Sequence, residues 1–272
     1  MLEAELEPEG LAWQTGVWNR ISGVYVNEID QRFVPVVEAT VARAELTVGE
    51  TALDLGTGTG AVAQRAAEIV GPSGGVVGVD ISSDMLAAAH KRLARLGLNN
   101  VTLREGRAES IPVDDAAFDA VLASLSMMYM LDRAAAAREI ARILRPGGCF
   151  VASVWAGPED CDIVHFQQTA GRLAGPPPVP GVGPASMADP TTFLGQLAAA
   201  GIEARIESRV LSFDFDDFES AWDALAGVTT AHLSAEQQQE AKDAVTAALY
   251  PNGDGPRRFE NLTHFIVGRA GA

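Results

Sequence analysis

The amino-acid sequence predicts an α/β fold built on a doubly wound sheet with helices on both faces. Short apolar runs rich in β-branched residues alternate with longer segments of helical periodicity, which is typical of βαβ units with right-handed crossovers. These runs are apolar almost throughout, as expected of parallel strands that are buried on both faces. The predicted strands of this core are Thr51–Leu55, Val76–Asp80, Val101–Glu105, Phe118–Ala123 and Cys149–Trp155.

The segments between these strands are predicted to be helices over Ala61–Val70, Asp84–Leu96 and Ala134–Leu144. The second helix has clear boundaries, because two serines precede its apolar face and Gly97 follows it. The third ends at Arg145-Pro146-Gly147-Gly148, since proline and glycine cannot continue a helix.

The segments that flank this core are less regular. Leu11 to Arg43 has helical periodicity, whereas Gly175–Pro184 contains five of the fourteen prolines and is predicted to be an irregular loop. The remaining predicted elements are a helix from Asp189-Pro190 to Ala200, a strand over Glu203–Phe213, a helical pair over Phe215–Gly227 and Ser234–Leu249, and a last strand over Asn261–Val267.

Composition and charge narrow the class of protein. The chain has 272 residues, 47% of them hydrophobic, which is enough for a sizeable core and excludes wholesale disorder. Its net charge of −16 and scattered basic residues argue against a nucleic-acid partner, which would require a Lys/Arg patch. Cys149 and Cys161 are interpreted as two reduced thiols. We expect a cytoplasmic protein with no signal peptide and no membrane insertion.

The most informative segment is Asp54-Leu55-Gly56-Thr57-Gly58-Thr59-Gly60-Ala61, which follows a predicted strand and begins a helix. Glycines at such a turn allow the backbone to approach a ligand closely. Gly56, Gly58 and Ala61 also satisfy the G-x-G-x-x-G/A pattern of dinucleotide-binding proteins. Asp80 ends the second strand, 20 residues after Gly60. A carboxylate that could accept ribose hydroxyls is therefore present whether the loop binds a dinucleotide or another cofactor that contains a ribose.

Asp54 discriminates between two candidate ligands of this loop, a dinucleotide and S-adenosylmethionine. It lies two residues before the first glycine of the loop. A pyrophosphate is anionic and binds helix N-terminal N–H groups best without a carboxylate nearby. The methionyl end of S-adenosylmethionine carries an α-ammonium and a sulfonium, both cationic. The carboxylate therefore favours S-adenosylmethionine.

At these residues the sequence resembles the class I S-adenosylmethionine-dependent methyltransferases, specifically the methyltransferase type 11 group, which is similar to ubiquinone/menaquinone C-methyltransferases. The resemblance rests on five motifs in order and covers most of the chain. They are Leu53–Gly60, Val77–Ser82 with Met85-Leu86, Glu105–Glu109 with Ile111-Pro112 and Phe118-Asp119, Leu144–Gly148, and Trp18-Asn19-Arg20 with Tyr25.

The resemblance implies a seven-stranded sheet of order 3-2-1-4-5-7-6 with the seventh strand antiparallel. It also implies a role for each matching residue. Gly56 and Gly58 would line the methionyl part of the cofactor, Asp80 would bind the ribose, and Met85 would pack on the adenine. Arg107 stands where the family often has an acid. The full predicted set of cofactor residues is Tyr25, Asp54, Gly56, Gly58, Asp80, Ile81, Met85, Gly106, Ala108, Glu109 and Ser124.

Methyl transfer from a sulfonium is an in-line displacement, so the protein mainly positions the reactants and excludes water. The apolar run after the fourth strand predicts an acceptor wall that includes Met128 and Tyr129, with Trp155 at the end of the fifth strand. If a general base is used, His165 is the predicted candidate. Oxygen-ligand clusters and His/Cys spacings typical of metal sites are absent, so no metal is expected.

We therefore predict a single methyltransferase domain over residues 1–272 that acts on a small, largely apolar acceptor, either aromatic, quinone-like or lipid-like. Its parts would be an N-terminal helical lid (1–45), a cofactor-binding core (46–155), substrate-side insertions (156–189 and 214–260) that form a helical cap, and segments that complete the sheet (190–213 and 261–272). An NAD(P)-binding oxidoreductase, a non-catalytic S-adenosylmethionine-binding protein and a macromolecule methyltransferase remain as alternatives. The sequence leaves open whether the chain forms a homodimer.

Overall fold

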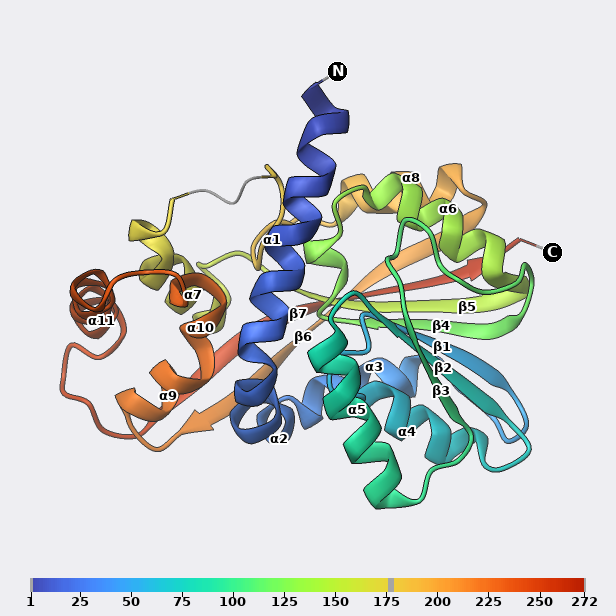
Figure 1. Cartoon of the computed structure of the whole chain (residues 1–272), viewed down its shortest axis with the longest axis horizontal. Coiled ribbons are helices and arrows are strands. Elements are labelled where there is room, and N and C mark those ends of the chain that lie inside the picture. The colour runs from blue at the N-terminus through green and yellow to red at the C-terminus, as the bar shows by residue number, and fades with distance from the viewer. Residues whose placement is uncertain (1, 176–178, 272) are drawn as a thin grey trace.

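The fold is known from a computed structural model that describes residues 2–175 and 179–271. It consists of a seven-stranded sheet with helices on both faces and a separate group of helices at one end (Figure 1). The prolines at 176–178 of the predicted irregular loop lie outside the described residues.

The sheet has the strand order β3-β2-β1-β4-β5-β7-β6, which confirms the predicted order. Strands β1 to β5 are parallel, and β7 pairs antiparallel with both β5 and β6. The strands are β1 (Thr51–Leu55), β2 (Gly75–Asp80), β3 (Val101–Glu105), β4 (Phe118–Ser124), β5 (Leu144–Trp155), β6 (Ile202–Phe215) and β7 (Arg257–Ala270). Because the order reverses between β1 and β4, the carboxyl ends of these two strands form a crevice where a ligand can bind.

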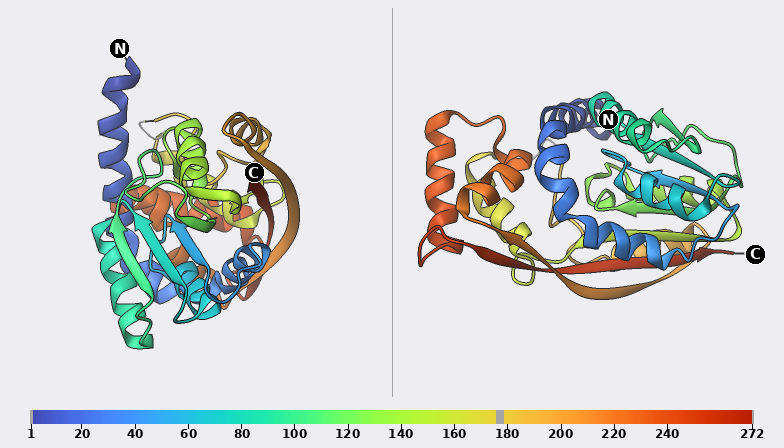
Figure 2. Two further views of the ribbon diagram at one scale, coloured as in Figure 1. Left: turned by 90° about the vertical axis from the view of Figure 1, so that its right-hand side faces the viewer. Right: turned by 90° about the horizontal axis from the view of Figure 1, so that it is seen from below.

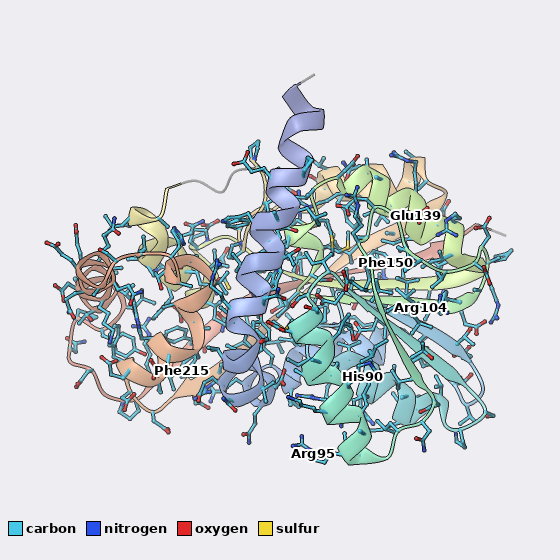
Figure 3. The ribbon with its side chains drawn as sticks, in the orientation of Figure 1. His90, Arg95, Arg104, Glu139, Phe150 and Phe215 are labelled. Carbon is cyan, nitrogen blue, oxygen red and sulfur yellow. The ribbon has the colours of Figure 1, made fainter. Side chains whose placement is uncertain are left out.

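Helices cover the sheet in two layers (Figure 2). One face carries α3 (Val34–Arg43), α4 (Ala61–Val70) and α5 (Ser83–Leu96), and the other carries α6 (Arg133–Ile143) and α8 (Thr191–Ala199). The α5 boundaries are those that the sequence predicts, since the Ser82 hydroxyl accepts the Met85 amide at 3.1 Å and Gly97 has a φ of +67°. The helical layers bury Phe150 and Leu53 completely. Phe150 lies on β5 (Figure 3).

The N-terminal segment is one long, interrupted helix that crosses the carboxyl ends of the strands (Figure 1). It consists of α1 (Leu2–Val24), a π-helical turn η1 (Tyr25–Ile29), a short α2 (Asp30–Arg32) and then α3. π-helical turns are frequent at functional sites, because they re-aim side chains within a helix. Here the turn bends the chain where it passes over the glycine loop.

Strands β6 and β7 extend beyond the rest of the sheet to a group of helices (Figures 1 and 2). This group contains α7 (Asp162–Ala170) with the single turn η3 (Gly171–Leu173) that follows it, α9 (Phe218–Leu225), α10 (Gly227–Thr230) and α11 (Ala235–Leu249). Another single turn, η2 (Met127–Tyr129), follows β4. Phe215 at the end of β6 packs on Phe259 of β7, with ring centroids 4.8 Å apart. The sequence analysis predicts the helical pair here, but it does not predict α7.

Candidate active site

The glycine loop between β1 and α4 has a backbone that only glycine adopts readily. Gly56, Gly58 and Gly60 have φ values of +72°, +54° and +84°. A Cβ on Gly56 would also lie 2.5 Å from the Cβ of Ser126, so this position lacks space for any side chain. A Cβ on Gly58 would have no neighbour within 4 Å, and Gly58 lines the pocket described below. The loop thus presents bare backbone to a ligand.

Asp80, at the end of β2, holds the glycine loop in place by hydrogen bonding. Its Oδ2 accepts the Gly58 amide at 2.8 Å, and its Oδ1 accepts the Ser82 amide at 2.9 Å. Burial raises the pKa of this carboxyl above its usual range, and the backbone hydrogen bonds partly offset that effect. Each carboxylate oxygen can accept a second hydrogen bond, so Asp80 retains acceptor capacity toward the pocket.

Asp54, the carboxylate that the sequence analysis uses to distinguish the candidate ligands, is 1% exposed. Its Oδ2 accepts the Thr57 hydroxyl at 2.6 Å and the Ala63 amide at 2.9 Å. Burial raises the pKa of the Asp54 carboxyl to about 7, against the lowering effect of these hydrogen bonds. A cation in the pocket would favour the ionised form.

One pocket joins these groups and has a volume of about 1120 Å³, counting its open part. Strands β1, β2 and β4 supply one side, and α1 to α3 supply the other. Every predicted cofactor residue lines it: Tyr25, Asp54, Gly56, Gly58, Asp80, Ile81, Met85, Gly106, Ala108, Glu109 and Ser124. The structure therefore brings this predicted set together around one cavity.

At the end of the pocket formed by β2 and β3, Met85 and Ala108 are buried apolar walls. Glu109 accepts the backbone amides of Leu131 and Asp132 at 2.9 and 3.1 Å, so it holds the segment after η2 against this end. Its other oxygen lies 3.7 Å from Nε of Arg107. The Glu109 carboxylate therefore stabilises this wall of the pocket through its contacts with the Leu131 and Asp132 amides.

The N-terminal helices are fastened over the pocket by polar and aromatic contacts. Asp30 accepts the Thr59 hydroxyl at 2.5 Å and forms an ion pair with Arg92 of α5. Trp18 packs edge-on against both Tyr25 and Tyr129, with centroid distances of 6.0 and 4.8 Å. Burial raises the pKa of Tyr25 above its usual range, with smaller effects from Asp30 and Asp80, so its hydroxyl stays protonated at neutral pH.

The sequence analysis identifies Trp18 and Tyr25 in this N-terminal wall but misses Asp30 and Phe33, which also line the pocket. Asp30 directly follows the π-helical turn and accepts the Thr59 hydroxyl, and no local pattern in the sequence predicts that turn.

Two of the three predicted substrate-side residues lie outside this pocket. Of Met128, Tyr129 and Trp155, the structure brings only Tyr129 to the pocket. Met128 is completely buried, and Trp155 packs against Phe33 and Phe213 at centroid distances of 5.7 and 6.3 Å.

His165, the candidate base, lies on α7 and lines a different hollow. Its separation from the pocket arises because α7 belongs to the helical group at the end of the sheet. The His90 side chain, on α5, is exposed (Figure 3).

Within residues 2–175 and 179–271, no group of three or more His, Cys, Asp and Glu side chains could hold a metal ion. No helix in the same part of the chain has both the length and the hydropathy needed to cross a bilayer.

Residues 46–172 match a family model described as a methyltransferase domain. Among curated proteins, the nocamycin O-methyltransferase of Saccharothrix syringae is 38% identical over 132 residues, covering 48% of this chain and 47% of the relative. The ubiquinone/menaquinone biosynthesis C-methyltransferase UbiE of Hahella chejuensis is 30% identical over 141 residues, which cover 52% of this chain and 54% of the relative. The chain thus spans about half the length of these relatives.

Solved structures share the fold at lower identity. The YcgJ protein of Bacillus subtilis has a TM-score of 0.63 at 20% identity and covers 88% of this chain and 99% of its own. The [4+2]-cyclase SpnF has a TM-score of 0.59 at 24% identity, and the match covers 88% of this chain and 81% of the cyclase. At these identities the likeness shows the fold alone. SpnF, which shares this fold, is a cyclase, so the fold by itself does not determine the activity. The sheet order, the glycine-loop motifs and the match of residues 46–172 to a methyltransferase domain together make this chain similar to the class I S-adenosylmethionine-dependent methyltransferases.

Proposed function

We propose that this protein binds S-adenosylmethionine in the pocket beneath α1 and transfers its methyl group to a small, largely apolar acceptor. The proposal rests on one observation above all: the glycine loop, Asp54, Asp80 and the β3 end of the pocket line a single cavity. When bound, the cofactor supplies an electrophilic methyl group for in-line displacement. The residues of the chain position the two reactants and exclude water.

The chemistry of the pocket suits this cofactor better than a dinucleotide. Asp80 has acceptor capacity left for ribose hydroxyls, and Gly56 and Gly58 allow close approach of a ligand to the backbone. Asp54 lies beside the loop, where a pyrophosphate would meet a buried carboxyl group. The positive methionyl end of S-adenosylmethionine would instead be attracted by the ionised form of that group.

The rest of the lining supports an apolar acceptor. Ile29, Phe33, Val37, Leu125 and Tyr129 contribute the wall that the N-terminal helices and the end of β4 form. The compounds printed in the names of the relatives, nocamycin and ubiquinone/menaquinone, agree with this class but belong to those proteins.

Histidine, cysteine and lysine do not occur among the described residues that line the pocket. The carboxylate next to the apolar wall, Asp30, is already bound to Thr59 and Arg92. A protonated nucleophile would therefore have little help in losing its proton. We propose that the acceptor brings an oxygen or carbon acid that ionises readily near neutral pH, such as an acidic phenol or an enolised ketone.

A panel of phenols and quinols of similar size but graded acidity tests this proposal. Formation of S-adenosylhomocysteine should be fastest for the most acidic members at pH 7, and the rate for a weaker acid should rise with pH as its anion accumulates. Binding of S-adenosylmethionine without turnover on any acceptor would support a non-catalytic binding protein. Binding of NAD(P) in its place would support an oxidoreductase.

A further inference from the structure

Strand β6 forms one edge of the sheet, with β7 on its inner side (Figure 2). Its 14 residues pair with β7 in one continuous register from Ile202 to Phe215. Among the described residues, no backbone group outside β7 hydrogen-bonds to the main chain of residues 203–210. The amides and carbonyls of this stretch that point away from β7 are therefore available to another strand.

The β6 edge lacks several features that protect the edges of sheets. Edge strands of native proteins are commonly very short, interrupted by proline or a bulge, or lined by lysines. The sequence of β6, IEARIESRVLSFDF, contains neither proline nor lysine, and its pairing with β7 has no register shift. The edge thus offers a long, uninterrupted stretch for pairing with a further strand.

The charged side chains of β6 alternate in sign along one face. Glu203, Arg205, Glu207 and Arg209 occupy every second position, so they point to the same face of the sheet and their charges cancel. This face is the one that α3 covers, since Arg43 of α3 forms an ion pair with Glu207 at 2.9 Å. Arg205 also pairs with Glu207, at 2.7 Å. Glu203 and Arg209 are exposed, and neither forms an ion pair with another described residue.

We propose that β6 pairs antiparallel with β6 of a second copy of this chain, about a two-fold axis that passes through the Ile206 pair. Such an axis is perpendicular to the sheet, so it keeps equivalent faces on the same side. It places Glu203 opposite Arg209 of the second copy and Arg205 opposite Glu207 of the second copy, and each pair occurs twice. Opposite charges that face each other directly stabilise an antiparallel pair, whereas like charges destabilise it.

Only this register pairs all the alternating charges. Moving the axis by one residue, to Arg205 or to Glu207, would place like charges opposite each other, and moving it by two would leave half of these charges unopposed. On the other face, the Ile206 side chains would meet at the axis, and Val210, which is 51% exposed, would lie opposite Ile202 of the second copy. The pairing would therefore also remove apolar surface from water. The charge order thus favours a second copy of this chain over an unrelated strand.

Sedimentation velocity of the full chain tests this pairing. Interfaces of ordinary size reach micromolar affinity or better, so the wild type should sediment as a dimer at about 100 μM. Arg209→Glu sets two carboxylates against each other twice per dimer and should weaken association by roughly tenfold or more. Arg95→Glu, on the exposed side of α5, changes the net charge equally and should leave the dimer intact. The dimer does not depend on the proposed methyl transfer, because no residue of β6 lines the cofactor pocket.

An exchange of charges separates loss of the interface from loss of the fold. Glu203→Arg and Arg209→Glu should each associate weakly alone, with an unchanged circular dichroism spectrum. An equimolar mixture of the two should form a heterodimer, because both facing pairs then join opposite charges again. The proposal is overturned if the wild type stays monomeric, if Arg209→Glu dimerises as tightly as the wild type, or if the mixture remains monomeric.

Discussion

The amide of Gly58 donates a hydrogen bond of 2.8 Å to Oδ2 of Asp80, which joins the glycine loop after β1 to the end of β2. The two residues belong to separate motifs in the sequence. In the fold one carboxylate fastens the loop and also faces the pocket. Loop geometry and ribose recognition are therefore expected to depend on the same side chain.

Replacing Asp80 should weaken S-adenosylmethionine binding strongly. Asp80→Asn keeps the shape but turns one acceptor into a donor that faces an amide, and it removes the charge. Loss of a charge-assisted hydrogen bond costs roughly 1.5–3 kcal/mol, which corresponds to about tenfold or more in affinity. Calorimetric titration measures this change. Asp84→Asn, which alters an exposed acid in the first turn of α5, should bind normally; equal losses in both variants would contradict the assignment.

The glycines of the loop should respond differently to substitution. Gly58→Val should abolish cofactor binding while the circular dichroism spectrum stays α/β, because its side chain would enter the pocket and its φ of +54° costs only about 1–2 kcal/mol. Gly56→Ala should lower Tm further, because its Cβ would also collide with Ser126. Normal binding by Gly58→Val would show that the loop is only a turn.

The cofactor affinity should depend on pH through Asp54. Its pKa of about 7 lies above the usual 3.8, so the ligand-free protein holds a proton there at acidic pH. A cationic ligand prefers the carboxylate, and affinity should rise from pH 6 to 8 and then level off. Calorimetry in buffers of different ionisation enthalpy should detect proton release near pH 7. A pH-independent affinity, or the same profile in Asp54→Asn, would contradict this role.

The raised pKa of the Asp54 carboxyl also predicts how the free energy of unfolding changes with pH. The unfolded chain loses this proton near its usual pKa, whereas the folded protein retains it until about pH 7. The contribution of Asp54 to the free energy of unfolding therefore falls as pH rises from about 4 to 7 and is constant above that range.

The ion pair between Arg92 and Asp30 should control how long the N-terminal helices stay closed. Both side chains are largely buried, and Asp30 also holds Thr59 of the glycine loop. Arg92→Met leaves the Asp30 carboxyl without its cation, so stopped-flow dissociation of S-adenosylmethionine should accelerate by about an order of magnitude, as a loss of ~1.4 kcal/mol implies. Arg95→Met, on the exposed side of the same helix (Figure 3), is the control and should dissociate at the wild-type rate.

The cofactor-binding half of the molecule could be predicted from sequence because its signals are local. Positive φ values restrict positions 56, 58 and 60 to glycine, and Ser82 and Gly97 mark the ends of α5. Every member of the predicted cofactor set except Tyr25 lies at or soon after the carboxyl end of a strand at that edge of the sheet, so the set lines one pocket.

The acceptor side could not be predicted in this way. Trp155 is placed by its packing against Phe33 and Phe213, which come from distant parts of the chain. His165 follows a strand that ends near the crevice, yet α7 packs against α11 and α10 and carries it to a separate hollow. Such placements depend on tertiary packing between helices, which neither periodicity nor motif spacing encodes.

Hydrogen–deuterium exchange of the full chain with and without S-adenosylmethionine tests the central claim most directly. The proposed pocket predicts protection in three places at once: the loop at 56–60, the residues after β2 at 80–85, and the N-terminal segment at 25–30. NAD⁺ at the same concentration should protect none of them. Protection by NAD⁺, or an S-adenosylmethionine footprint that misses these segments, would contradict the assignment of this pocket.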